Sequence, residues 1–176
     1  RDTAVGGNFD ASISLANLDG TNGFVLNGID GGDRSGSSVS SAGDVNGDGI
    51  ADILILASGE IYLVFGMNSE TDGNFAASIN LETLDGTNGF VLEISGSSFN
   101  TSVSSAGDVN GDGLDDILIG NSGIDVDGLE AAGQVYVVFG GETVLAEFDG
   151  ADGSADGRIE LDLLLPTDQP NQDIKG

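Results

Sequence analysis

The stretch Asp44–Asp52, which reads DVNGDGIAD, decides how this chain of 176 residues is organised. A second copy, DVNGDGLDD, spans Asp108–Asp116, and the likeness extends upstream as SVSSAGDVNGDG at an offset of 64 residues. Each copy runs directly into a short apolar segment, DILIL or DILI, and the unbroken run within Asp52–Ala57 is expected for a strand buried on both faces. The chain is therefore built from repeats, each with an acidic loop that leads into a strand.

Two further pairs of segments confirm the repeat. LDGTNGFVL occurs at Leu18–Leu26 and again at Leu84–Leu92, whereas YLVFG at Tyr62–Gly66 corresponds to YVVFG at Tyr136–Gly140. The last pair is ten residues farther apart than the acidic loops, which places an insertion within Gly123–Gly133. Insertions in repeats map to loops, so we expect this Gly-rich, acidic segment to project from one face.

One repeat contains four expected strands and no helical periodicity. They are Ser37–Val45, Asp52–Ala57, Ile61–Phe65 and Phe90–Ile94. Four antiparallel strands with short turns fit a β-propeller blade, so the predicted fold class is all-β with about two four-stranded blades. We expect a partial propeller, or one that an oligomer completes.

The repeats divide the chain into four expected parts. These are an N-terminal segment with the outer strand of a preceding or neighbouring blade (1–36), blade 1 (37–94), blade 2 (95–141) and an acidic C-terminal segment with a possible loop and linker (142–176). The second repeat lacks its own DGTNGF strand, and from Pro166 onward the sequence is polar and typical of a linker or tail. LDGTNGFVL at Leu18–Leu26 precedes any complete blade, so we expect self-association or further blades of a parent chain to use it, with the second repeat as its natural recipient.

The acidic loops have the spacing of a cation site. Side-chain oxygens fall on alternate residues of a tight loop, and Gly49 permits the sharp turn. The expected ligands are Asp44, Asn46, Asp48, Ile50 (backbone carbonyl) and Asp52 in the first loop, and Asp108, Asn110, Asp112, Leu114 (backbone carbonyl) and Asp116 in the second. Hard oxygen ligands on a flexible loop suit Ca²⁺ better than Mg²⁺, which needs a near-ideal octahedron.

Two other interpretations of these loops are weaker. A solvated acidic turn has no reason to keep this spacing twice, because packed carboxylates repel one another without a cation. An EF-hand needs flanking helices and a Glu at position twelve, where this chain has Ile55 and Ile119. Because the two loops belong to different repeats, we expect each to bind calcium independently.

The unit GDVNGDGIADILI followed by IYLVFG, and its second copy, resembles the FG-GAP repeat of integrin α-subunit β-propellers and their bacterial relatives. The FG element matches Phe65-Gly66 and Phe139-Gly140, while the GAP element is degenerate (Ala57-Ser58-Gly59 and Gly120-Asn121-Ser122). The resemblance covers roughly residues 18 to 141. It implies a calcium ion in a hairpin loop between the first two strands of a blade, and often adhesion, although such blades also occur in lectins and beside enzymes.

A third acidic loop, DGSADGRIE, lies in the C-terminal segment. Its possible ligands are Asp152, Ser154, Asp156, Arg158 and Glu160. Serine is a weaker ligand than asparagine, and the SSAG flank is missing, so a simple turn or linker is an equal alternative.

The amino-acid composition limits the kinds of molecule that we expect the chain to bind. The 30 acidic and 4 basic residues give a net charge of -26, which disfavours nucleic acid and anionic membrane surfaces and favours cations. No apolar run approaches the roughly 20 residues of a membrane span. The chain starts at Arg1 without Met, so we expect a mature or excised piece, secreted or at the cell surface.

The functional expectation is a calcium-binding module for adhesion, protein interaction or assembly, with an unknown protein or glycan ligand. With no His, no Cys and scattered glutamates, we expect no enzyme activity. A lectin-like propeller, or a non-catalytic accessory domain of a secreted hydrolase, remains the alternative. The absence of Trp and the presence of only 2 Tyr weaken the lectin interpretation.

Overall fold

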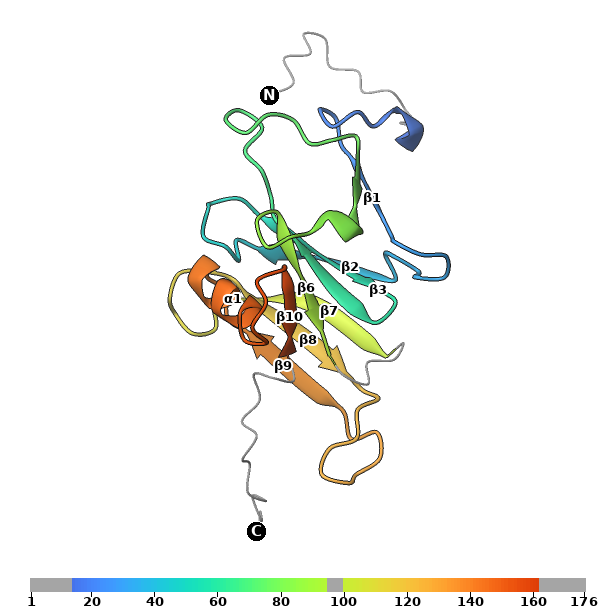
Figure 1. Cartoon of the computed structure of the whole chain (residues 1–176), viewed down its shortest axis with the longest axis vertical. Coiled ribbons are helices and arrows are strands. Elements are labelled where there is room, and N and C mark those ends of the chain that lie inside the picture. Colours follow the sequence, from blue (N-terminus) through green and yellow to red (C-terminus); the bar gives the residue numbers. More distant parts are fainter. Residues whose placement is uncertain (1–13, 95–99, 162–176) are drawn as a thin grey trace.

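Strands dominate the computed structural model, which describes residues 14–94 and 100–161 (Figure 1). The first repeat forms an antiparallel sheet from four strands within one or two residues of those predicted. They are β2 (Ser38–Gly43), β3 (Asp52–Ala57), β4 (Glu60–Val64) and β6 (Gly89–Glu93). Their order, β6-β4-β3-β2, is that of a meander with neighbouring strands paired, as expected for a blade.

The second repeat forms three strands, in the order β7-β8-β9. They are β7 (Thr101–Gly107), β8 (Asp116–Asn121) and β9 (Gln134–Val138). As the sequence predicts, the second repeat has no outer strand of its own, and no described strand pairs with the free edge of β9. The insertion between β8 and β9 projects as a loop from the end of this sheet (Figure 1).

Two parallel strand pairs were not predicted. β10 (Arg158–Glu160) joins the outer edge of the first sheet by pairing with β6, so this sheet has five strands. β1 (Val25–Asn27) pairs with β5 (Ser78–Asn80) as a separate two-stranded sheet. The N-terminal segment LDGTNGFVL thus lies beside β5 rather than on the second repeat. No sheet formed by the described strands closes into a barrel.

Residues after the second repeat fold further than expected. The α-helix α1 (Glu142–Asp149) follows β9, and Leu145 on it is fully buried in the core. Two single-turn 3₁₀ helices, η1 (Leu15–Asn17) and η2 (Leu81–Thr83), precede the two DGTNG turns. The predicted polar tail from Pro166 lies outside the described residues. None of the described helices has the length and apolar character needed to cross a membrane.

The hydrophobic core has two parts because strand side chains alternate between faces. One face of the first sheet, with Leu54, Leu63 and Leu92, packs against the second sheet through Ile119 and Tyr136. β2 and β7 lie beside each other at this junction. The opposite face of the first sheet packs in a second cluster, which the following residues form: Ile55, Ala57, Tyr62, Val64, Leu81, Leu84 and Val91, with Leu26 and Ile53 at its margin.

Candidate metal centres

The acidic loops occupy corresponding places in the two sheets. The first joins β2 to β3 and the second joins β7 to β8, each at a hairpin between the first two strands of its repeat. The pairing register shifts at Ser41/Gly43 and again at Ser105/Gly107, just before each loop. Such bulges redirect the strand, and here both turn the chain into the loop in the same way.

Within the first loop, side-chain oxygens organise the backbone. Asp44 accepts hydrogen bonds from Gly47 N–H through Oδ1 (2.9 Å) and from Gly49 N–H through Oδ2 (2.9 Å). Asn46 Oδ1 accepts from Asp48 N–H (3.0 Å). The Asp48 Oδ1 atom accepts from Ile50 N–H (2.7 Å). Asp44, Asn46 and Asp48 therefore bond the backbone of their own loop.

The second loop repeats this pattern. Asp108 accepts from Gly111 N–H (2.7 Å) and Gly113 N–H (3.0 Å), through different carboxylate oxygens. Asn110 Oδ1 accepts from Asp112 N–H (2.9 Å), and Asp112 Oδ1 accepts from Leu114 N–H (2.9 Å). These equivalent hydrogen bonds show that the two loop sequences adopt the same local structure.

The ninth loop residue, Asp52 or Asp116, is the buried member of each set. Asp52 begins β3 and Asp116 begins β8, and at most 1% of the surface of either residue is exposed. Asp52 accepts from Val45 N–H (2.9 Å) and Gly66 N–H (2.8 Å). Burial raises the pKa of the Asp52 carboxyl, the two N–H groups lower it, and the nearby charge of Asp48 raises it.

The Gly of each FG pair closes its loop, a role that the sequence analysis did not assign. Gly140 N–H donates to Asp116 Oδ1 (2.9 Å), as Gly66 N–H does to Asp52. A Cβ on Gly66 would lie 2.6 Å from the Ala51 carbonyl oxygen, and one on Gly140 would collide with the Asp115 carbonyl oxygen. Only glycine allows the segment that follows β4 or β9 to approach the loop this closely. The signal was present, because FG recurs in both repeats.

The donor chemistry of both loops fits calcium. Each offers three carboxylates, an amide oxygen and a main-chain carbonyl, all hard oxygens in the order that a calcium loop uses. Their carboxylates accept hydrogen bonds from the loop backbone, and no three acidic, His or Cys side chains of the described residues converge on one point. Asp44, Asn46, Asp48, Asp52 and the Ile50 carbonyl would hold an ion in the first loop.

The two loops differ in their surroundings. The first opens onto a cavity of about 480 Å³, lined by Asn46 and Asp48 on one side and by Glu142 at the start of α1. The second loop is more exposed at Asp108 and Asn110 than the first loop is at Asp44 and Asn46. The carboxylate of Glu142 therefore adds negative potential beside the first loop.

The loops are also bonded to each other, contrary to the expectation of independent sites. Asp115 at position eight of the second loop accepts from Asp44 N–H through Oδ2 (2.8 Å), and its own N–H donates to the Asp44 carbonyl (3.0 Å). Gly141 N–H donates to the Val45 carbonyl (2.7 Å). The residue that corresponds to Asp115 in the first loop is Ala51, so the repeat comparison alone could not reveal this link.

The possible third loop folds as a turn that leads into β10. Asp152 Oδ1 accepts from Ser154 N–H (2.7 Å), and Ser154 Oγ donates to Asp156 Oδ2 (3.1 Å). Desolvation and the charges of Asp152, Glu93 and Asp156 raise the pKa of Glu160. Arg158 forms ion pairs with Glu60 (2.8 Å) and Glu93, which attach β10 to the first sheet. The acidic side chains of this turn therefore lie near one another, and Arg158 helps to hold β10 against the first sheet.

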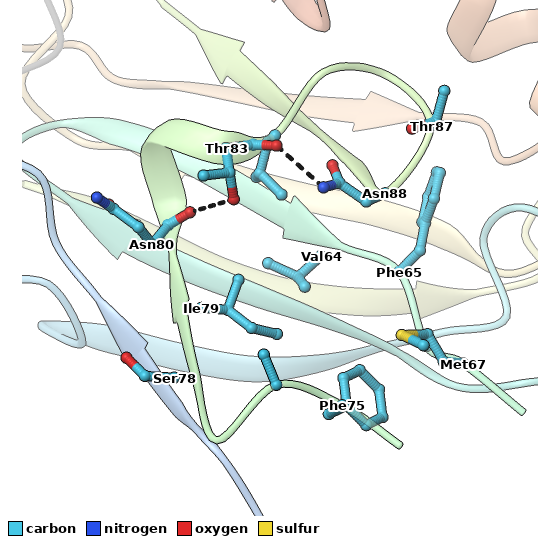
Figure 2. Close-up of a pocket in the computed structure, with 13 residues that line it drawn as sticks. Val64, Phe65, Met67, Phe75, Ser78, Ile79, Asn80, Thr83, Thr87 and Asn88 are labelled. Carbon is cyan, nitrogen blue, oxygen red and sulfur yellow. Dashed lines mark hydrogen bonds between the residues drawn. The ribbon is translucent and has the colours of Figure 1, made fainter. Parts of the chain in front are cut away.

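An apolar cavity of about 520 Å³ lies apart from the loops, between the end of β4 and the β5–η2 segment (Figure 2). Phe65, Met67 and Phe75 contribute to its wall. On the rim, Thr83 Oγ1 donates to the Asn80 carbonyl (2.7 Å), and Asn88 Nδ2 donates to the Thr83 carbonyl (3.0 Å). These hydrogen bonds hold the turn that forms the rim of the cavity.

Comparison with protein families agrees with the geometry. The FG-GAP repeat model matches residues 35–74 and 99–138, which contain both acidic loops and the strands on either side. No curated protein matches the chain. The chain therefore contains two FG-GAP repeats, which share loop, bulge, buried Asp and closing Gly and are consistent with an FG-GAP/integrin-α-like family.

Proposed function

We propose that the chain is a calcium-binding β-propeller repeat module of a secreted or cell-surface protein, acting in adhesion, protein interaction or structural assembly. The observation that carries the proposal is the matching arrangement of the two loops. Asp44 and Asp108 make corresponding bonds, and Asp52 and Asp116 are buried at corresponding positions. If each loop binds its own cation, the same oxygen-rich loop is expected at the same hairpin of both repeats.

Electrostatics supports the same proposal. The first loop gathers three carboxylates within nine residues and the second gathers four, in a chain whose net charge is -26. A divalent cation would offset the repulsion between them and would compensate the burial of the ninth carboxylate. When bound, calcium supplies a fixed positive charge that stiffens the hairpin and holds the sheets' loop ends in one arrangement. The residues themselves order the loop backbone and leave oxygen lone pairs for the ion.

The role outside the cell rests on the family. FG-GAP repeats occur in extracellular proteins, where calcium is available at millimolar concentrations suited to weak sites. Stiffened loops at one end of a set of sheets form a steady surface for a protein partner. The proposal includes no catalytic step.

Calcium titration of the whole chain, followed by calorimetry, tests the proposal, with Mg²⁺ as the comparison ion. We expect saturable binding of Ca²⁺ and much weaker binding of Mg²⁺, because a flexible oxygen loop does not enforce the octahedral geometry that Mg²⁺ requires. Equal affinity for the two ions, or no saturable heat with either, would contradict the proposal.

Carbohydrate binding is the second candidate, and the cavity of Figure 2 is where it would occur. Phe65 and Phe75 provide aromatic surface there, and Asn80 and Asn88 lie at its rim. A glycan array, with Phe75→Ala as the control, distinguishes this candidate. Binding that Phe75→Ala removes would support it, whereas an array without signal would leave the calcium module as the function.

A further inference from the structure

The five-stranded sheet of the first repeat provides a template for the other two sheets. Its order is β10-β6-β4-β3-β2, while the remaining strands form the sheets β1-β5 and β7-β8-β9. Each smaller sheet corresponds to one part of the large sheet. The pair β5-β1 corresponds to β10-β6, and the three strands β9-β8-β7 correspond to β4-β3-β2.

The first part of this correspondence is close in register. Val25 pairs with Ser78 and Leu26 with Ile79, and the counterparts Val91 and Leu92 pair with Arg158 and Ile159. Each strand pair also has an equivalent main-chain hydrogen bond at its start. Val25 N–H donates to the Ala77 carbonyl (3.0 Å), and Val91 N–H donates to the Gly157 carbonyl (2.8 Å).

The turns before β1 and β6 are also equivalent. Thr21 Oγ1 donates to Asp19 Oδ1, and Thr87 Oγ1 donates to Asp85 Oδ1, both at 2.6 Å. β1 therefore has the structure of an outer blade strand, with β5 on one side. β6 has β10 on one edge and β4 on the other. The edge of β1 that corresponds to the β4 edge has no strand partner among the described residues.

The second part of the correspondence concerns β9. Ile61 and Leu63 on β4 are fully buried, but their counterparts Val135 and Val137 on β9 are 63% and 47% exposed. Phe65 packs edge to face against Phe90 of β6, with ring centroids 5.8 Å apart. Its counterpart Phe139 is 45% exposed.

A groove of about 340 Å³ runs along β9. It is lined by all five residues of the strand and by Phe139, Phe148 and Leu161. Successive residues of a strand face opposite sides, so a groove that touches all of them follows the strand edge. An open apolar edge of this kind is a template for strand addition.

We propose that β1 of a second copy of this chain adds to the free edge of β9 and completes the second blade. The template gives the register. Leu63 pairs with Phe90 and Ile61 pairs with Leu92, so Val137 would lie opposite Phe24 of the second copy and Val135 opposite its Leu26. The resulting sheet, β5-β1 of one copy followed by β9-β8-β7 of the other, has the order of the first sheet. This inference does not depend on calcium.

A second copy is the occupant because the sequence of β1 is the sequence that fills this edge in the first sheet. The segment LDGTNGFVL is identical at Leu18–Leu26 and Leu84–Leu92. Within one molecule, β1 and β9 lie toward opposite ends (Figure 1). β1 needs no rearrangement to act as donor, since it can keep β5 on its other side, as β6 keeps β10.

The same placement would cover the exposed valines of β9. Leu26 packs against the second cluster on the opposite face of the first sheet, as its counterpart Leu92 packs against the second sheet. A sheet added to β1 would therefore continue from the margin of that second cluster. Each copy has one donor and one acceptor, so the association is head to tail and closes into a ring if the rotation permits. With about two blades per copy, a ring of about 4–8 blades would need about two to four copies.

Light scattering after size exclusion, at several concentrations of the whole chain, tests the association. We expect a multiple of the 17.6 kDa chain that dissociates on dilution. Val137→Lys places a charge in the groove and should weaken association by about tenfold or more. Leu129→Lys, on an exposed apolar residue of the β8–β9 insertion, is the matched control and should leave association unchanged.

Cross-linking tests the register, and the chain has no Cys that could interfere. Phe24→Cys chains and Val137→Cys chains, tagged differently, are mixed and treated with a short thiol cross-linker. We expect a heterodimer that contains one chain of each kind, and little product when Phe24→Cys is mixed with Leu129→Cys. A chain that stays monomeric at all concentrations, or an intramolecular link in the Phe24→Cys/Val137→Cys double variant, would overturn the proposal.

Discussion

Asp115 lies in the second acidic loop but binds the first one, accepting a hydrogen bond from Asp44 N–H at 2.8 Å. Its N–H returns a bond to the Asp44 carbonyl at 3.0 Å. Asp44 is the first expected ligand of its loop, so the orientation of its peptide depends on the neighbouring repeat. Loops in adjacent sheets are therefore parts of one hydrogen-bonded unit, and their ligand affinities should be coupled.

Replacement of Asp115 by Ala should weaken calcium binding at the first loop. Ala is the residue at the corresponding position of the first loop, Ala51, so the repeat tolerates it. We expect a loss of stability of about 1–3 kcal/mol, since Asp44 N–H loses a charged acceptor, and a several-fold loss of calcium affinity. Chemical unfolding and calcium titration measure the two effects.

The matched control for Asp115→Ala is Glu130→Ala, which removes the same charge from the exposed insertion. If both variants changed affinity equally, the effect would come from overall charge rather than from the bond to Asp44.

Calcium should raise the stability of the whole chain. A ligand that binds only the folded state at about a thousand times its dissociation constant stabilises by about 4 kcal/mol per site. Removal of the ion leaves three neighbouring carboxylates in each loop without a counter-charge. Thermal unfolding in millimolar Ca²⁺ should therefore show a melting temperature several degrees above that in EDTA. Superimposable curves would contradict this prediction, and the Asp48→Ala/Asp112→Ala double variant should lack most of the shift.

Glycine in the FG pair should be required for folding of the repeat. Gly66→Ala would place a Cβ 2.6 Å from the Ala51 carbonyl oxygen, so either the loop or the segment that follows β4 must move. We expect destabilisation of about 1–3 kcal/mol, as for other overpacked sites, together with weaker calcium binding. Gly31→Ala, at a site with no atom within 4 Å of the new Cβ, is the control for loss of glycine. Equal unfolding midpoints for the two variants would show that the contact is relieved without cost.

Local sequence was sufficient to predict the loops and the strands next to them. The expected strand Asp52–Ala57 is present with those bounds, and β6 differs by one residue at each end from the predicted Phe90–Ile94. The apolar run after each acidic loop marks a buried strand, and the DGTNG turn places a glycine where a positive φ is needed, as at Gly86. The missing outer strand of the second repeat was predicted from the missing segment.

Contacts between distant segments were not predictable from these patterns. β10 has only three residues, and it is held beside β6 by strand pairing and by the ion pairs of Arg158 with Glu60 and Glu93, all of which join segments far apart in the sequence. The resemblance of RIELDLL to SINLETL, around β10 and β5, was a signal that could have revealed it. α1 is short, begins after Gly141 without a side-chain cap, and is held by the burial of Leu145, which depends on the tertiary structure.

The central claim is that Asp44–Asp52 and Asp108–Asp116 each hold one calcium ion. Equilibrium dialysis at millimolar free Ca²⁺, with the metal counted by atomic emission, tests it directly. Salt at about 0.15 M limits diffuse accumulation of counter-ions around the acidic chain. Asp48→Ala and Asp112→Ala should each bind one ion fewer per chain than the unmodified protein, and the double variant two fewer, while Glu130→Ala should bind the full number. An unchanged count in the double variant would contradict the account.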